Sequence, residues 1–129
     1  MRKRINDAVA QIPRDGAGVV VIDTTTAMLI DEVDVRQACF GEELVRFVNR
    51  NPVDALSSDA AFAPGVRTRI SVVVSYRRVG VGLTLRREMR VYHNPYARTL
   101  LPFDFFREDG VEQWVIDRSR GPLLPRRVI

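Results

Sequence analysis

Asp23 is the residue whose type and position best suit catalysis. It follows the β-branched run at residues 19–22 and precedes three threonines. A carboxylate at the end of a strand can attack a phosphoryl group, but the reaction also needs a second acid to hold magnesium or to protonate the leaving group. Thr25 stands two residues on, where that acid is required. The spacing therefore favours a role for Asp23, or for one of the threonines, in capping the following turn.

The other candidate groups are an acidic cluster, one histidine and one cysteine. Asp31, Glu32 and Asp34 could ligate a metal, but consecutive acids near a helix start more often interact with the helix dipole, so we expect them to cap a helix. His93 has no second histidine, partner cysteine or recognisable nucleophilic serine, so we expect one local hydrogen bond at a strand end. Cys39 lies in a predicted helix as a small apolar side chain. We predict no catalytic residue, no metal and no cofactor.

The basic residues indicate binding rather than catalysis. The 129 residues include 20 basic and 16 acidic side chains, and residues 67–98 hold eight arginines against the single Glu88. Arg77, Arg86 and Arg90 are predicted to share one face of a β-hairpin, where guanidinium groups can contact the phosphates of DNA or RNA. The alternative is a solvated face on which Glu88 pairs with the neighbouring arginines.

The hairpin is predicted from alternation on both sides of Gly80. Apolar and polar side chains alternate through residues 70–77, and the alternation returns through residues 83–91. A two-residue turn at Gly80 and Val81 requires a positive φ at Gly80 and sets the pairing of the strands. The predicted pairs are Ile70 with Val91, Val72 with Met89, Tyr76 with Leu85, Ser71 with Arg90, Ser75 with Arg86 and Val73 with Glu88, and Arg87 falls on the apolar face beside Val74.

The rest of the chain divides into short helices and strands. Apolar spacing predicts a helix over residues 5–12, ended by Pro13, and a second helix over residues 35–48 with Gly41 inside it. The uninterrupted apolar run at residues 19–22 predicts a central strand covered on both faces. Further predictions are a short helical piece around residues 55–62, a last strand at residues 114–116 and a loose basic tail from about residue 118.

This order of elements predicts an α/β fold, with a small mixed sheet that has a central strand, a β-hairpin and two or three packing helices. Parallel pairing of residues 19–23 with the strand that begins at Ile70 would use the intervening helix as a right-handed crossover. Asp23 would then lie at the carboxyl end of a strand, where open α/β sheets bind ligands.

Length and composition fit one domain spanning residues 1–129. The single cysteine cannot form an internal disulfide, and no apolar run approaches the roughly 20 residues of a membrane span. We therefore expect a cytoplasmic protein that has no membrane partner.

Four stretches of the chain carry a family resemblance. They are residues 4–13 (RINDAVAQIP), 18–23 (GVVVID), 70–74 (ISVVV) and 92–97 (YHNPYA). Together they resemble the carboxyl-terminal half of restriction-endonuclease-like proteins of the PD-(D/E)XK family. The catalytic Asp and Glu-x-Lys of that family lie on strands before this helix, so the resemblance carries over no catalytic residue. It implies a detached, truncated or degenerate relative that lacks the catalytic strands.

Two function classes follow. The first is a non-catalytic basic α/β domain of a nuclease-like protein, associated with nucleic acid through Arg77, Arg86 and Arg90. The second is a protein-interaction or assembly domain that completes a partner chain or a homodimer, because a helix at residue 4 with no preceding strand leaves a sheet edge for another chain. Enzyme activity ranks third, and it would be that of a nuclease-related hydrolase.

Overall fold

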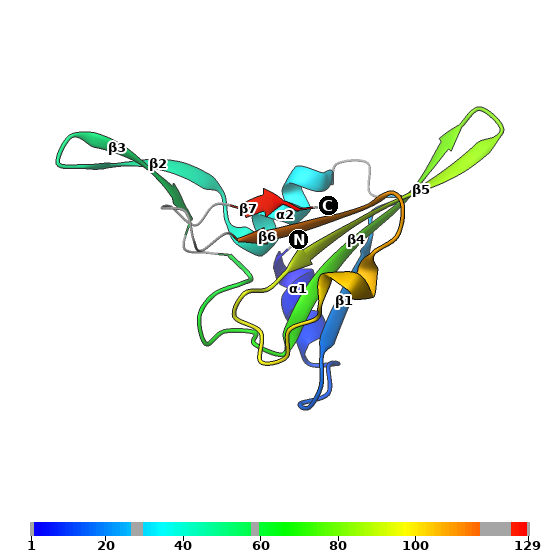
Figure 1. Cartoon of the computed structure of the whole chain (residues 1–129), viewed down its shortest axis with the longest axis horizontal. Coiled ribbons are helices and arrows are strands. Elements are labelled where there is room, and N and C mark those ends of the chain that lie inside the picture. Colours follow the sequence, from blue (N-terminus) through cyan, green and yellow to red (C-terminus); the bar gives the residue numbers. More distant parts are fainter. Residues whose placement is uncertain (1, 27–29, 58–59, 117–124, 129) are drawn as a thin grey trace.

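The protein is built on a mixed sheet with two helices packed on one face. The computed structural model describes residues 2–26, 30–57, 60–116 and 125–128. Its elements are α1 (Arg2–Val9), β1 (Gly18–Asp23), α2 (Glu32–Phe40), β2 (Glu43–Val48), β3 (Asn51–Leu56), β4 (Ile70–Val81), β5 (Thr84–His93), the 3-10 turn η1 (Phe103–Phe106), β6 (Val111–Ile116) and β7 (Pro125–Arg127). The main sheet has the strand order β1-β4-β5-β6-β7, and β2 and β3 form a separate hairpin (Figure 1). The predicted α/β class is confirmed.

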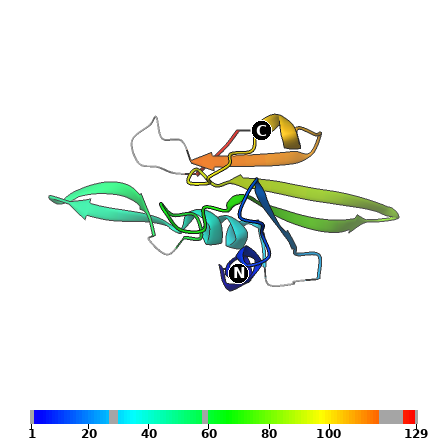
Figure 2. The same ribbon diagram turned by 90° about the horizontal axis from the view of Figure 1, so that it is seen from below.

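Helices α1 and α2 lie on the same side of strands β4 and β5, opposite η1 (Figure 2). Ile5 from α1 is buried in one cluster with Val35 and Phe40 from α2 and with Tyr92 from β5. Helix α1 confirms the helix predicted over residues 5–12, but it begins earlier, at Arg2, and ends at Val9. The apolar stripes of both helices therefore form one layer of the core.

The helix predicted over residues 35–48 is in fact two elements. Asp31 caps α2, since its Oδ1 accepts from the Asp34 amide at 3.0 Å and Asp34 Oδ2 accepts from the Asp31 amide at 2.9 Å. Gly41 ends α2 at a φ of 93°, where its amide donates to the Gln37 carbonyl at 2.8 Å. The capping role predicted for the acidic cluster is thus confirmed, whereas the second half of the predicted helix is strand β2.

Strands β2 and β3 form a hairpin arm that stands away from the main sheet (Figures 1 and 2). Val48 pairs with Asn51, and the two residues between them, Asn49 and Arg50, have φ values of 50° and 66°. Two successive positive φ values are typical of the type I′ turn that joins tight hairpins. The predicted helical piece around residues 55–62 is wrong, because β3 continues to Leu56 and no helix occurs among the described residues of that stretch.

Strand β1 is an edge strand of the sheet, not its centre. It pairs in parallel with β4, as predicted, from Gly18 beside Ile70 to Asp23 beside Tyr76. Its side chains alternate between buried and exposed, so only one of its faces is covered. The unbroken apolar run was a misleading signal, because Val19 and Val21 point away from the helix layer and remain exposed.

The β4–β5 hairpin is confirmed, but its register differs from the predicted one by four residues. Val74 lies opposite Val91, and the turn falls at Gly82 and Leu83, with a φ of 61° at Gly82. Gly80 is an ordinary strand residue opposite Leu85, so the predicted turn at Gly80 is wrong. The pairs that replace the predicted ones include Val72 with His93, Val73 with Tyr92, Ser75 with Arg90, Tyr76 with Met89, Arg77 with Glu88 and Arg78 with Arg87.

The last two strands extend the sheet beyond β5. Strand β6 contains the strand predicted at residues 114–116 and begins earlier, at Val111. Strand β7 pairs with it antiparallel, with Pro125 beside Ile116. The prediction of a loose tail is therefore wrong for residues 125–127, while residues 117–124 lie outside the described part of the chain.

A second, smaller core lies on the other face of the sheet. Val72, Val74 and Val91 are buried there. The partly buried side chains that pack on them are Met89, Leu101, Phe106 and Val111. Strands β4 and β5 are thus the ones covered on both faces over part of their length.

Candidate functional site

The structure places the three predicted phosphate-binding arginines on one face of the β4–β5 hairpin. Arg90 lies opposite Ser75, Arg77 opposite Glu88, and Arg86 opposite Val79. Because the register differs from the predicted one by an even number of residues, each side chain keeps the face that alternation assigns to it. This face is the one that the helices cover near Tyr92.

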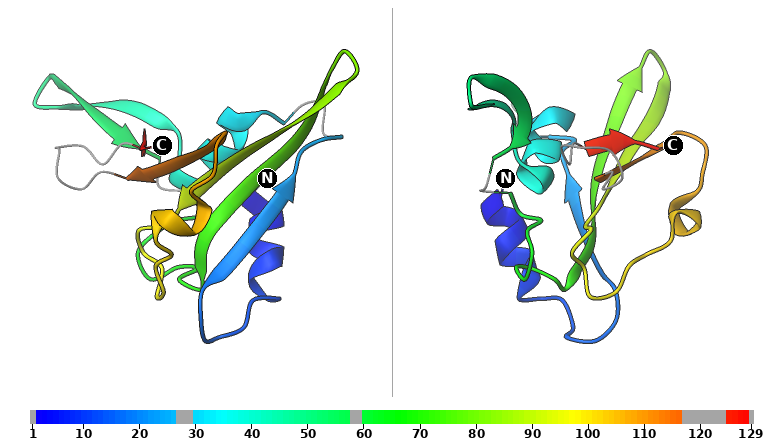
Figure 3. Two further views of the ribbon diagram at one scale, coloured as in Figure 1. Left: turned by 45° about the vertical axis from the view of Figure 1, so that its right-hand side comes forward. Right: turned by 60° about the vertical axis from the view of Figure 1, so that its left-hand side comes forward.

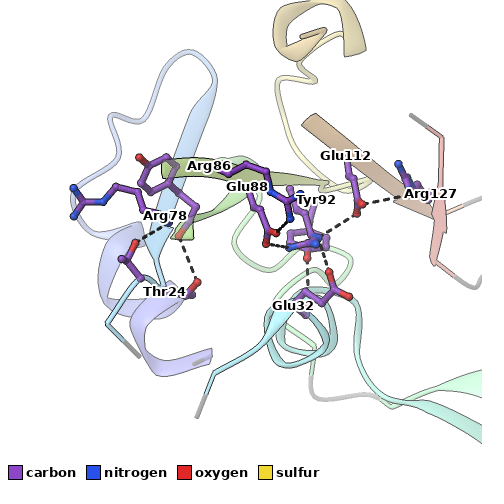
Figure 4. A network of polar contacts seen from close by, with 11 residues as sticks. Thr24, Glu32, Arg78, Arg86, Glu88, Tyr92, Glu112 and Arg127 are labelled. Carbon is purple, nitrogen blue, oxygen red and sulfur yellow. Dashed lines mark hydrogen bonds and ion pairs between the residues drawn. The ribbon is translucent and has the colours of Figure 1, made fainter. Parts of the chain in front are cut away.

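Arg90 is surrounded by carboxylates from three different elements (Figure 4). Its Nε lies 2.5 Å from Glu32 of α2 and 3.1 Å from Glu112 of β6, and its Nη1 lies 3.7 Å from Glu88. Burial by itself would lower the pKa of Arg90, but Glu32 and Glu112 outweigh this effect and raise the pKa. The Arg90 side chain therefore ties α2, β5 and β6 together, and its charge is neutralised within the protein.

Arg86 also has an internal partner. Its Nη2 donates to Glu88 Oε1 at 2.7 Å, and this bond is the main reason why the pKa of Glu88 lies below its usual value. The pairing matches the solvated, charge-balanced alternative for this face. Sequence reasoning did not identify Glu32 and Glu112 as partners, because they lie far from Arg90 in the sequence and no local pattern joins them.

A different pair of arginines is exposed further along the hairpin. Arg78 and Arg87 lie directly opposite each other on the face turned away from the helices. Like charges opposed across a strand pair repel each other. Beyond them, Leu83 and Leu85 are exposed at the end of the hairpin. This pair can be identified only from the correct register, because the predicted register sets Arg87 beside Val74.

Asp23 serves the turn that follows β1. Its Oδ1 accepts a hydrogen bond from the Thr25 amide at 2.9 Å, and hydrogen bonding to Thr25 holds the pKa of this exposed carboxyl below its usual value. Thr25 Oγ1 in turn accepts from the Arg78 amide at 3.1 Å, and the Thr24 hydroxyl donates to the Tyr76 carbonyl at 3.4 Å. The polar residues after β1 therefore fasten the turn to β4, as the capping interpretation predicts.

The outer edge of β1 is open. The Thr24 amide donates to the Tyr76 carbonyl at 2.9 Å, which shows that this residue faces β4. Backbone groups alternate in direction along a strand, so those of Val19, Val21 and Asp23 face outward. No strand of the described chain lies beyond them. Val21 is 62% exposed, and a groove of about 350 Å³ runs between α1 and β1, lined in part by Ala8 and by residues 17–21.

His93 lies beneath an apolar cavity. Its Nε2 is 2.8 Å from Gln113 Oε1, while Gln113 Nε2 donates to the Phe103 carbonyl at 3.0 Å. Because the amide nitrogen of Gln113 is used for Phe103, its oxygen faces His93 and must accept from a protonated Nε2. The bond is not local, as it joins β5 to β6. The neighbouring cavity of about 700 Å³ is lined by His93, Asn94, Pro95, Leu100, Leu101, Pro102, Phe103, Val115, Ile116 and Val128.

The remaining candidate groups give no site. Cys39 is fully buried in α2, and burial raises the pKa of its thiol. Within the part of the chain that the structure describes, no three histidine, cysteine or acidic side chains come together in a way that could hold a metal. No helix there is both long and apolar enough to cross a membrane.

Comparison of the chain with models of known protein families, with curated proteins and with solved structures gives no match.

Proposed function

We propose that the chain is an assembly domain that binds another protein chain through the open edge of β1. The observation that carries this proposal is the edge itself. No strand among the described residues pairs with the outward backbone groups of Val19, Val21 and Asp23, and the side chains of Val19 and Val21 are exposed beside them. Exposed edges of this kind accept an additional strand, whose backbone supplies the affinity and whose side chains fit the neighbouring surface.

The β2–β3 arm supports the same function. Val45, Phe47 and Val48 are all more than half exposed, with Phe47 at 72%. An isolated two-stranded hairpin is marginally stable in water, and burial of its exposed apolar side chains against a partner would stabilise it. A chain that projects such an arm and leaves a sheet edge open gains stability from a protein partner.

The experiment compares the wild-type chain with a double variant, Val19→Lys and Val21→Lys, which places charges on the edge. Size is measured by light scattering for the purified chain and by gel filtration in extract of the cells that produce it. Assembly predicts a wild-type mass above the 14.7 kDa of one chain and a variant of 14.7 kDa. The control Val66→Lys alters a side chain that is 44% exposed but lies outside the edge, and it should behave as wild type. A wild-type chain that runs as a monomer in both settings contradicts the proposal.

A second candidate function is binding of DNA or RNA by the β4–β5 hairpin, as in the nuclease-like, nucleic-acid-associated domain that the resemblance implies. The specific observation in its favour is the opposed, exposed pair Arg78 and Arg87. Phosphate groups between these guanidinium groups would relieve their repulsion. Arg77 is exposed on the other face of the same hairpin, whereas Arg86 and Arg90 are paired with carboxylates.

Titration of labelled duplex and single-stranded oligonucleotides at about 50 mM salt tests this candidate, because a phosphate footprint binds strongly there. Replacing Arg78 and Arg87 by Gln should weaken binding to every sequence alike and reduce the slope of log affinity against log salt by about 2. The matched control replaces the exposed Arg14 and Arg98 by Gln and should leave that slope in place. Absence of wild-type binding at this salt concentration contradicts the candidate.

A further inference from the structure

We propose that the partner at this edge is a second copy of the chain, joined by antiparallel pairing of the two β1 strands about a twofold axis at Val21. The inference rests on the proposed assembly function and adds to it the identity of the partner and the register of the contact. The main sheet would then run without interruption from one copy into the other.

The spacing of the outward backbone groups selects this register. Val19, Val21 and Asp23 face the open edge, so a symmetric pair centred on Val21 sets Val21 opposite Val21 of the second copy and Val19 opposite its Asp23. In an antiparallel ladder, residues that face each other in this way exchange both of their hydrogen bonds. A centre at Val20 would set Asp23 opposite Ala17, which lies outside the strand, and would leave fewer bonds.

The charge along α1 favours an antiparallel copy over another strand. Residues 2–4 are Arg-Lys-Arg, no acid stands in the first turn of α1 and no base stands in its last turn. This distribution opposes the helix dipole, which prefers acids at the start of a helix and bases at its end. Helix α1 runs alongside β1 in the opposite direction (Figure 3). A twofold axis at Val21 therefore places the basic turn of each α1 towards the carboxyl end of the other.

The groove between α1 and β1 has room for this approach. It is lined by Ala8, Gln11 and Ile12 on the helix side, none of which carries a charge. The groove itself therefore brings no charge into the contact, and the small side chain of Ala8 lets the second backbone come close.

Cysteine cross-linking tests the register directly. In the purified chain, Val21→Cys should form a disulfide-linked dimer on mild oxidation, because directly opposed residues of an antiparallel pair have Cα atoms about 5.5 Å apart, within disulfide range. Val19→Cys is the matched control: two Val19 positions would be offset by four residues along the strands, roughly 13 Å, and should not link. The wild-type chain should not link either, because its single Cys39 is buried. Melting curves of both variants under reducing conditions check that each one folds.

Light scattering of the wild-type chain at about 100 μM completes the test, since this concentration would populate a dimer of micromolar affinity. The inference is supported if the wild-type chain has the mass of a dimer and the Arg4→Glu variant has the mass of one chain. A wild-type monomer, or a Val19→Cys dimer in place of the Val21→Cys dimer, overturns it. If the purified chain is a monomer but the edge variant still changes its size in cell extract, the assembly function stands with a different partner. If the purified chain is a monomer and the edge variant does not change its size in cell extract either, both proposals fail.

Discussion

The Nε of Arg90 lies 3.1 Å from Oε2 of Glu112, so that one ion pair joins β5 to the parallel strand β6. The same nitrogen contacts Glu32 at the start of α2, at 2.5 Å. One guanidinium group therefore fixes the helix layer relative to two strands of the sheet. A planar group with five donors suits this arrangement better than the single ammonium group of lysine.

We expect Arg90→Met to destabilise the protein by about 2 kcal/mol, because it removes the cation that Glu32, Glu88 and Glu112 share, although Arg86 stays beside Glu88 and Arg127 beside Glu112. The Arg90 side chain is 21% exposed, so the loss stays below that of a fully buried ion pair. Urea unfolding at pH 7 measures it. Added salt should recover part of the stability of the variant by screening the repulsion. A change of less than about 0.5 kcal/mol would place the ion pairs among ordinary surface contacts.

Gly82 and Gly80 provide a matched test of the hairpin register. Gly82→Ala should cost about 1 kcal/mol, because Gly82 holds a φ of 61° that disfavours a side chain. Gly80→Ala should be neutral or slightly stabilising, since its φ is ordinary and a Cβ there meets no atom within 4 Å. Thermal unfolding of the two variants measures the difference. The reverse ranking would support the turn at Gly80 that the sequence predicts.

Alternation grouped the side chains of this hairpin by face correctly, but it did not show that the face of Val73 and Tyr92 carries the helix-covered core, and it could not select the turn. Gly80 and Gly82 are both flanked by alternating residues, and moving the turn by two positions changes each pairing partner by four while leaving every face the same. Tertiary packing selects the turn at Gly82, because the observed register sets Val73 beside Tyr92, and both are buried under the helices. The local sequence pattern does not reveal that contact.

Strand β2 shows a related ambiguity. Residues 35–48 have apolar side chains at positions that fit a helix as well as a strand, and short apolar runs do not distinguish the two. The distinguishing residue is Gly41, whose positive φ ends α2. The run at residues 19–22 misled for a different reason: β-branched residues predict a strand, but they do not reveal whether a neighbour covers its second face.

A substitution at Gly41 tests that explanation. Gly41→Ala should cost about 2 kcal/mol or more, because a Cβ would lie 2.7 Å from the Ser57 carbonyl oxygen in addition to requiring a φ of 93°. Gly65→Ala is the control: its φ is 70°, but a Cβ there meets nothing within 4 Å, so it should cost only about 1 kcal/mol. If chemical denaturation gives equal losses of stability for Gly41→Ala and Gly65→Ala, the contact with Ser57 contributes nothing.

Glu88 should make stability depend on pH in the acid range. Its pKa in the folded protein lies below the usual 4.5, chiefly because Arg86 donates to it. A lowered folded-state pKa contributes stability that is complete above pH 4.5 and is lost as pH falls through the folded value. Nuclear magnetic resonance titration of the Glu88 carboxyl should show its pKa rising towards 4.5 in the Arg86→Ala variant. An unchanged pKa would mean that Arg86 and Glu88 do not pair in solution.

His93 should give a second pH dependence at higher pH. Burial lowers the pKa of His93 below 6.5, and the hydrogen bond to Gln113 only partly opposes this. Below pH 6.5 the unfolded chain therefore takes up a proton that the folded chain does not, and stability falls as pH decreases from 6.5 to the folded pKa. His93 is the only histidine in the chain, so its ring proton signal can be titrated without overlap.

The His93→Gln variant isolates this effect. Glutamine keeps a side-chain donor for Gln113 but does not titrate, so the loss of stability between pH 6.5 and the folded pKa of His93 should disappear while the carboxylate dependence below pH 4.5 remains. His93→Leu is the contrasting variant: it leaves the buried Gln113 oxygen without its donor and should cost about 1–3 kcal/mol even at pH 7.5. If wild type and His93→Gln follow the same curve of unfolding free energy against pH, then His93 is not buried as the structure shows. A ring titration at or above pH 6.5 would lead to the same conclusion.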